Sequence, residues 1–79
     1  ISKTLFASLD YAKEYSLAET KLMVEQAIIA TEGLELEYYE IVDGTSLQMV
    51  NSWVEADCIV GCIAVYCGKV RLIDNIRYK

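Results

Sequence analysis

The first fifteen residues place apolar side chains at helical spacing. Phe6 widens a stripe whose other members are Ile1, Leu5, Leu9 and Ala12. Residues three or four positions apart lie on one face of an α-helix, so the pattern predicts an amphipathic helix over residues 1–15.

A second helix is expected to begin at the sequence Ser16-Leu-Ala-Glu19. The Ser16 hydroxyl can accept a hydrogen bond from the Glu19 amide, and the Glu19 carboxylate can accept one from the Ser16 amide, which makes a capping box. Gly33 stands where a left-handed residue would end the helix. Because so few residues join the two helices, we expect an antiparallel hairpin. The predicted apolar face of the second helix consists of Leu22, Met23, Ala27, Ile29 and Ala30.

From residue 34 onward the hydrophobic period changes to two, as in a β-strand. In the sequence LELEYYEIVD, one face carries Leu34, Leu36 and Tyr38. After Tyr38 the pattern slips, because Glu40 falls on the apolar face and Ile41 on the polar face. A β-bulge near Tyr38 and Tyr39, or the loss of cover on one face, would explain the slip. The following DGTS is expected to be a turn, and residues 47–55 to be irregular with a short helical turn.

Residues 58–67 read CIVGCIAVYC and are apolar on both faces. This pattern predicts a strand buried on both sides in the middle of a sheet. One face carries Ile59, Ile63 and Val65, and the other carries Cys58, Val60, Cys62, Ala64 and Tyr66. A turn at Gly68 and Lys69 leads to a third strand, one face of which carries Val70, Leu72, Ile76 and Tyr78.

The order of these elements predicts an α+β fold, with a two-helix hairpin packed on a small three-stranded antiparallel sheet and strand 58–67 in its centre. We expect residues 1–79 to form one domain, because a chain this short supports only one thin core. Two helices can cover one face of the central strand, so something outside this sequence should cover the other. The chain also starts at Ile1 without a methionine, which suggests a fragment of a longer protein.

The net charge of −5 argues against a nucleic acid partner, since phosphate binding requires a basic face. The longest apolar run, residues 58–67, is about half the ~20 residues that a membrane-spanning helix needs. The chain does not open with the basic and apolar regions of a secretory signal. We therefore expect neither a nucleic acid nor a membrane as a partner.

The three cysteines resemble a metal or disulfide site only superficially. Cys58 and Cys62 would share one face of a strand about 13 Å apart, which is too far for a disulfide or a common zinc ion. Cys67 would point to the opposite face. We predict free thiols that act as small buried hydrophobes. Free thiols suit a reducing compartment, so a cytoplasmic location is expected.

The sequence offers little catalytic chemistry of its own. It contains no histidine, so it cannot supply a Ser-His or Cys-His nucleophile. Its four glycines are scattered and form no phosphate-binding loop. The carboxylates of Glu35 and Glu37 are expected to be solvated on the polar face of a strand. We therefore predict no catalytic, cofactor-binding or metal-binding residue within residues 1–79.

Asp74 is out of place in the third strand, because its position aims it at the core. It could be a functional carboxylate that reaches an active site elsewhere, it could mark the end of regular strand pairing, or it could accept hydrogen bonds from backbone amides or an arginine. We favour the last interpretation, in which Asp74 and Asn75 bond neighbouring backbone amides where the strand meets the end of the sheet, since a carboxylate facing a core must be paired or hydrogen-bonded. Arg71 lies on the opposite face and is a weaker candidate partner than a loop amide, or Arg77 past a bend.

Three segments in a fixed order resemble a known family. LELEYYEIVDGTSLQMV, then an apolar strand that ends in glycine, then RLIDN, are similar to the C-terminal part of the pantothenate synthetase (pantoate–β-alanine ligase) family. The resemblance is firm over residues 34–75 and looser through the two helices. The turn VDGTSL departs from the family, which usually has an acidic or proline-containing variant there.

The resemblance implies a lid domain over an upstream nucleotide-binding catalytic domain, which would be this chain's main partner. In the parent enzyme ATP, assisted by magnesium, adenylates pantoate, and the amine of β-alanine then attacks the adenylate to give pantothenate and AMP. The family's His-x-Gly-His and Lys-x-Ser-Ser-Arg motifs lie upstream and are absent here, so no functional residue carries over and the fragment alone should bind neither ATP nor magnesium. Self-association of the fragment is a further expectation. The alternative is a non-enzymatic α+β module for ligand binding or dimerisation.

Overall fold

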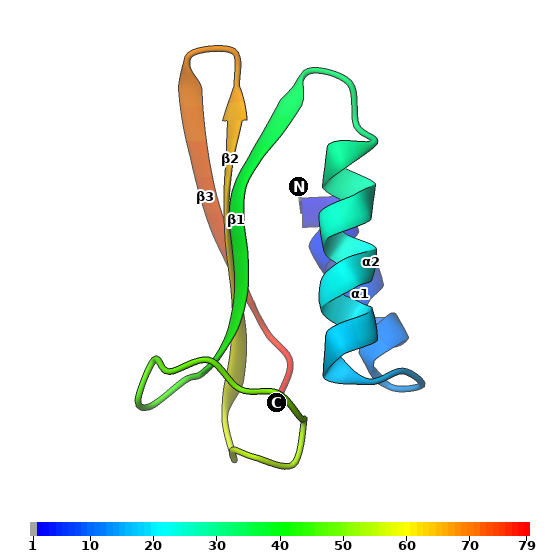
Figure 1. Cartoon of the computed structure of the whole chain (residues 1–79), viewed down its shortest axis with the longest axis vertical. Helices are drawn as coiled ribbons and strands as arrows, with labels where there is room; N and C mark the ends of the chain where they lie inside the picture. The colour runs from blue at the N-terminus through cyan, green and yellow to red at the C-terminus, as the bar shows by residue number, and fades with distance from the viewer. Residues whose placement is uncertain (1) are drawn as a thin grey trace.

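The structure is a computed structural model that describes residues 2–79. Two helices precede three strands: α1 (Ser2–Ala12), α2 (Leu17–Ile29), β1 (Leu34–Asp43), β2 (Ile59–Cys67) and β3 (Val70–Arg77). The strands form one antiparallel sheet in the order β1-β2-β3, and the antiparallel helices lie on one side of it (Figure 1). The predicted α+β fold with residues 58–67 in the central strand is confirmed. Ile1, predicted on the stripe of the first helix, lies outside the described residues.

Helix α1 is shorter than predicted and buries a partly different face. It ends at Ala12, and Leu5 is buried while Leu9 is half-buried. Phe6, which was expected to widen the apolar stripe, is 66% exposed. Ser8 occupies the buried position instead, because it lies one turn after Leu5 on the face that meets the sheet.

The capping box of α2 is confirmed. The Ser16 amide donates to Glu19 Oε1 over 3.1 Å, and the Glu19 amide donates to Ser16 Oγ over 3.2 Å. Gly33 has a left-handed φ of 88°, but it lies in the turn to β1 and does not terminate the helix, which ends at Ile29 with Ala30 as its C-cap.

The predicted apolar face of α2 was largely wrong, although Met23 does pack against the core. Leu22 and Ile29 are 53% and 68% exposed, whereas the buried stripe consists of Leu17, Thr20, Val24 and Ile28. Thr20 tolerates burial because its hydroxyl donates to the Ser16 carbonyl over 2.9 Å, which satisfies it within the helix. A polar residue therefore stands at a core position, and the sequence pattern alone placed the core stripe about one residue away.

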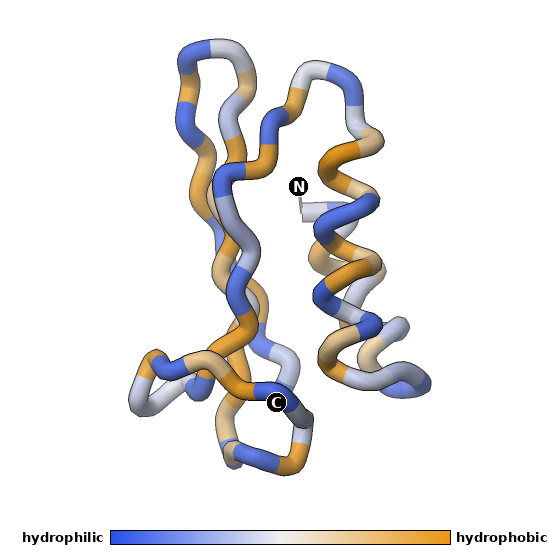
Figure 2. Tube along the Cα trace, viewed as in Figure 1, coloured by the Kyte–Doolittle hydropathy of each residue, from blue (hydrophilic) through white to orange (hydrophobic). Residues whose placement is uncertain are grey.

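The predicted β-bulge is confirmed in β1, starting one residue earlier than expected. The pairing passes from Leu36 opposite Val65 to Tyr38 opposite Ala64, so Glu37 is the extra residue. After the bulge Tyr39 and Ile41 face the helices and are almost fully buried. The alternation of apolar and polar residues along β1 can be followed in Figure 2. The bulge thus accounts for the phase slip in the sequence.

The helices cover the face of β2 that carries Ile59, Ile63 and Val65, all of which are fully buried. The strand begins at Ile59, so Cys58 lies just before it. On the outer face Ala64 is buried by its neighbours, while the others remain half-buried: Val60, Cys62 and Tyr66. The predicted shortage of cover on one face is therefore present in residues 2–79.

Strand β3 continues through Asp74 without interruption, since pairing with β2 extends to Arg77. The interpretation that Asp74 marks the end of pairing was wrong. Asp74 faces the helix side, as its position predicted, and its Oδ1 accepts a hydrogen bond from the Asn75 amide over 2.8 Å. Asp74 thus bonds a neighbouring backbone amide, as expected, but this amide lies within the paired strand and not in a loop or at the end of the sheet. Arg71 bonds to Glu37.

The DGTS turn is confirmed, because Asp43 Oδ1 accepts from the amides of Thr45 and Ser46 over 2.7 and 3.3 Å. Residues 44–58 are irregular, as expected. Met49 forms an isolated bridge to Val42, and residues 52–55 form a hydrogen-bonded turn in place of the predicted helical one. This long connection packs under the helix hairpin through Trp53, whose indole donates to the Tyr15 carbonyl over 3.0 Å.

A chain of hydroxyl groups links the two layers. Ser8 Oγ donates to the Leu5 carbonyl over 2.5 Å and lies 2.7 Å from the Tyr78 hydroxyl, which in turn contacts the Tyr39 hydroxyl. Since Ser8 has already used its only proton, Tyr78 donates to Ser8 and Tyr39 donates to Tyr78. Burial, reinforced by the hydrogen bond to Tyr78, raises the pKa of Tyr39. The linked hydroxyl groups thereby join β1 through Tyr39, the segment after β3 through Tyr78, and α1 through Ser8.

Candidate functional site

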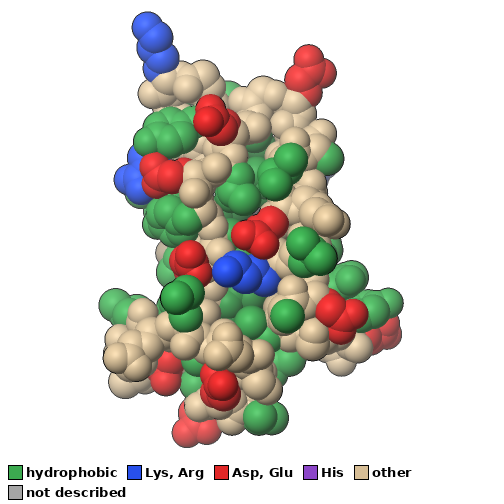
Figure 3. All heavy atoms as spheres, in the orientation of Figure 1, with side chains coloured by type: hydrophobic (Ala, Val, Ile, Leu, Met, Phe, Trp, Pro, Cys, Tyr) green, Lys and Arg blue, Asp and Glu red, His purple; other side chains and the backbone are tan. Residues whose placement is uncertain are grey.

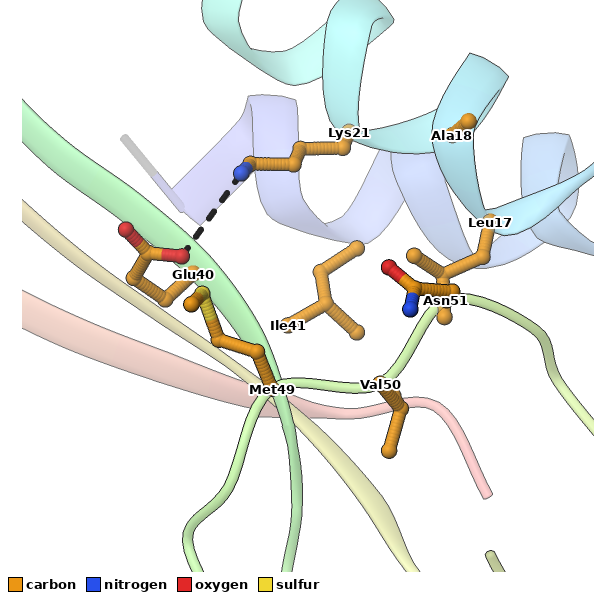
Figure 4. Close-up of a pocket in the computed structure, with 8 residues that line it drawn as sticks. All are labelled: Leu17, Ala18, Lys21, Glu40, Ile41, Met49, Val50 and Asn51. Carbon is orange, nitrogen blue, oxygen red and sulfur yellow. Dashed lines mark ion pairs between the residues drawn. The ribbon is translucent and has the colours of Figure 1, made fainter. Parts of the chain in front are cut away.

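A hollow of about 360 Å³ lies between the first turns of α2, the free edge of β1 and the segment after the DGTS turn. Its lining is mostly apolar with one basic, one acidic and one amide side chain, and consists of Leu17, Ala18, Lys21, Glu40, Ile41, Met49, Val50 and Asn51 (Figure 4). In the space-filling view, basic atoms lie against acidic atoms near the middle of this face, with apolar side chains around them (Figure 3).

The two charged groups of this hollow are directed at each other. Lys21 extends from α2, and its Nζ lies 3.6 Å from Oε2 of Glu40 on β1. At this distance Lys21 and Glu40 form an ion pair, but the two atoms are too far apart for a good hydrogen bond. Glu40 Oε2 is buried and has no hydrogen-bond partner among the described residues. The bulge at Glu37 produces this arrangement, because it turns Glu40 away from the core and toward the sheet edge where Lys21 lies.

The hollow does not assemble catalytic machinery from the described residues. A general acid–base or nucleophilic site needs a reactive group held by an activating partner. Here the only ionisable groups that line the hollow are Lys21 and Glu40, and each offsets the charge of the other. The arrangement covers the free edge of β1, and the expectation that residues 1–79 hold no catalytic or ligand-binding residue stays a prediction.

A second polar cluster crosses the outer face of the sheet. Glu37 accepts hydrogen bonds from Arg71 Nη2 over 2.7 Å and from the Tyr66 hydroxyl over 2.9 Å. The Arg71 guanidinium, followed by the Tyr66 hydroxyl, holds the pKa of Glu37 below its usual range. The hydrogen bond to Glu37 raises the pKa of Tyr66.

The sequence interpretation of Glu37 as a solvated carboxylate was therefore incomplete. The cluster links all three strands, but its members are exposed enough that it serves as a surface brace. The sequence does not reveal this cluster, because its three members come together only through the bulge in β1 and the register of the neighbouring strands.

The other candidate groups do not converge on a site. All three cysteines are free, as predicted, although Cys67 is exposed and so does not act as a buried hydrophobe. Among residues 2–79, no three His, Cys, Asp or Glu side chains gather closely enough to hold a metal ion. Neither of the two helices described is long and apolar enough to cross a membrane.

Comparison with known proteins gives a consistent result. The sequence profile of the family described as pantoate-beta-alanine ligase matches residues 1–77. Over all 79 residues the chain is 60% identical to a pantothenate synthetase of Phocaeicola vulgatus and 57% identical to one of Bacteroides thetaiotaomicron, and it covers 28% of each.

Solved structures agree with the sequence comparison. The fold superimposes on a crystal structure of pantothenate synthetase from Thermus thermophilus with a TM-score of 0.83 and 28% sequence identity. The match covers 98% of this chain and 28% of that one. The chain thus spans a little over a quarter of the length of the relatives it matches.

Proposed function

The chain belongs to the pantoate–β-alanine ligase family, and from that premise we propose that residues 1–79 form the C-terminal lid domain of such an enzyme. The observation that carries the proposal is the match of nearly the whole chain to relatives more than three times as long. A domain of this size, with an incompletely covered sheet, leaves room for a separate catalytic domain in the parent protein.

The parent enzyme would join pantoate to β-alanine in two steps. The pantoate carboxylate attacks the α-phosphorus of ATP, which forms pantoyl adenylate and releases pyrophosphate. The amine of β-alanine then attacks the acyl carbon and displaces AMP, leaving the amide of pantothenate. An enzyme that stabilises the charge of these transition states needs fixed cationic groups or backbone amides around the phosphates.

The residues that line the hollow between α2 and β1 do not fit ATP or a magnesium ion. The hollow in Figure 4 contains a single lysine, and the neighbouring Glu40 carboxylate would repel a triphosphate. We therefore assign ATP and magnesium binding to the nucleotide-binding domain outside this chain, and to this chain the covering of that site. We also propose that the parent enzyme is cytoplasmic. The three free cysteines support this location, because free thiols are typical of a reducing compartment.

The proposal is tested with the full-length protein that contains this chain. Pantoate, β-alanine and ATP are supplied together, and AMP release is measured with each substrate omitted in turn. We expect AMP release that requires both pantoate and β-alanine, and none from the 79-residue chain alone. A full-length protein without this activity would favour the alternative of a non-enzymatic α+β module.

A further inference from the structure

The chain contains two methionines, and the structure places them in different environments. Met23 is half-buried on α2 and packs against the hydrophobic core. Met49 lies in the connection between β1 and β2, where it is 69% exposed. An oxidant has to reach the thioether sulfur, so exposure favours oxidation of Met49 over Met23.

The backbone at Met49 is fixed, although the connection around it is irregular. Met49 forms an isolated bridge with Val42 of β1. The next residue, Val50, donates its amide hydrogen to the Ile41 carbonyl over 3.2 Å. The exposed thioether is therefore carried from a defined point at the edge of β1.

Met49 lines the same hollow as the ion pair of Lys21 with Glu40. In Figure 4 the Met49 side chain extends toward Glu40, and Lys21 reaches the same carboxylate from α2. The 3.6 Å between Lys21 Nζ and Glu40 Oε2 exceeds a good hydrogen bond, so the ammonium group has donors to offer. A thioether sulfur is only a weak acceptor and does not compete for them.

Oxidation changes the chemistry of this side chain. Methionine sulfoxide is polar, and its oxygen is an acceptor that the thioether lacks. At position 49 that oxygen would lie in a hollow whose basic group is the incompletely bonded Lys21. The geometry therefore favours a contact between the sulfoxide oxygen and the Lys21 ammonium group.

We propose that Met49 is a site of reversible oxidation by hydrogen peroxide, and that its sulfoxide oxygen accepts a hydrogen bond from Lys21. The sulfur lone pair attacks one peroxide oxygen, the S–O bond forms as the O–O bond breaks, and a proton transfer releases water. Sulfur loses two electrons and the peroxide gains them. A methionine sulfoxide reductase returns the thioether with two electrons from a dithiol. The inference needs only residues of this chain and does not depend on the proposed ligase activity.

Peptide mapping by mass spectrometry tests the site in the full-length protein that contains this chain. The folded protein is treated with dilute hydrogen peroxide, and dithiothreitol then reverses disulfides and sulfenic acids at the cysteines without reducing sulfoxides. We expect one added oxygen on the Met49 peptide several-fold faster than on the Met23 peptide. The two reductases, one for each sulfoxide epimer, should remove it.

The Met23 peptide is the matched control, because both methionines are equally accessible once the protein is unfolded. In concentrated urea the two oxidation rates should become similar. A rate at Met49 in the folded protein that is equal to or slower than the rate at Met23 would overturn the proposal.

The contact with Lys21 is tested by comparing the melting temperatures of peroxide-treated and reductase-repaired protein. Oxidation should lower the melting temperature more in Lys21→Leu than in the parent, because only the parent can donate to the sulfoxide oxygen. Met49→Leu, which cannot form this sulfoxide, should show no difference between treated and repaired samples. Equal shifts in the parent and Lys21→Leu would refute the contact and with it the proposal. Ligase activity is measured separately, so an active enzyme with an unreactive Met49 would refute this inference alone.

Discussion

At the scale of single residues, the buried hydroxyl of Ser8 shows why polarity is an imperfect guide to the core. Ser8 is fully buried, and it is tolerated because it donates to the Leu5 carbonyl and accepts from Tyr78. Its partner lies seventy positions away in the sequence. Helical spacing placed Leu5 correctly, but no local pattern could indicate that a serine on that stripe would meet the hydroxyl of a distant tyrosine.

The ionisation of Glu37 leads to a prediction about pH. The pKa of Glu37 is lowered in the folded protein, chiefly by Arg71, so the carboxylate contributes stability above the unfolded-state pKa of about 4.5 and loses it as the pH falls further. Glu37→Gln should therefore lower the urea midpoint slightly at pH 7, and the difference from the parent should shrink toward pH 3. The effect is small because the pair is exposed.

The control for Glu37 is Glu35→Gln, an exposed carboxylate on the same strand. It should change the urea midpoint at pH 7 less than Glu37→Gln does, because Arg71 bonds to Glu37 and not to Glu35. If Glu37→Gln and Glu35→Gln gave the same profile between pH 7 and pH 3, the cluster of Glu37, Tyr66 and Arg71 would have no energetic role.

At the scale of the elements, the sequence predicted the type and order of all five, together with the capping box and the bulge. It failed at the rotation of α2, because the exposed Leu22 and Ile29 are as apolar as the buried Val24 and Ile28. When a helix is apolar over much of its surface, the hydrophobic pattern does not define one face, and packing against β1 decides. The same ambiguity affected Phe6, because helical spacing placed it next to the buried face of α1 although it is exposed.

The N-terminus of α2 gives a second prediction. Ser16→Ala removes the acceptor for the Glu19 amide and should lower the free energy of unfolding by about 1 kcal/mol. Ser16→Asp is the matched control, because its carboxylate keeps the acceptor and also favours the positive end of the helix dipole. The measurement is the urea midpoint of the parent and both variants. A midpoint for Ser16→Ala equal to that of the parent would show that the cap contributes nothing.

Strand β3 explains the unusual position of Asp74. It is an edge strand, and an edge strand with free backbone groups can pair with another molecule. A charged residue on its inner face opposes such pairing, because a new strand and its cover would bury the carboxylate. The other edge, β1, carries a bulge and the ion pair of Glu40 with Lys21. Both edges are thus protected, each by a different means.

At the scale of the whole molecule, the sequence indicated that two helices cannot cover both faces of the central strand. It could not show which face the helices cover, because that depends on how α1 and α2 pack against the strands. The hollow of Lys21 and Glu40 was likewise invisible, since its walls come from α2, β1 and residues 49–51. Surfaces built from several elements become predictable only when the arrangement of those elements is known.

The two layers meet at Gly61, and this contact gives the last prediction. A Cβ atom at Gly61 would lie 2.6 Å from the Tyr39 hydroxyl and 2.9 Å from Tyr78 Cε2. Gly61→Ala should therefore displace both rings, break the hydroxyl chain that reaches Ser8, and cost about 1–3 kcal/mol of unfolding free energy.

Because the closest clash is with the Tyr39 hydroxyl, removing that oxygen should relieve part of the cost. The double variant Gly61→Ala/Tyr39→Phe should then be more stable than the sum of its single variants by about 0.5 kcal/mol or more, measured from urea unfolding. Tyr38→Phe in the same background is the control, because Tyr38 follows the bulge on the outer face, paired with Ala64, and should give no relief. Strict additivity of Gly61→Ala and Tyr39→Phe would show that Gly61 is not needed to admit the two tyrosine rings that hold α1 against the sheet.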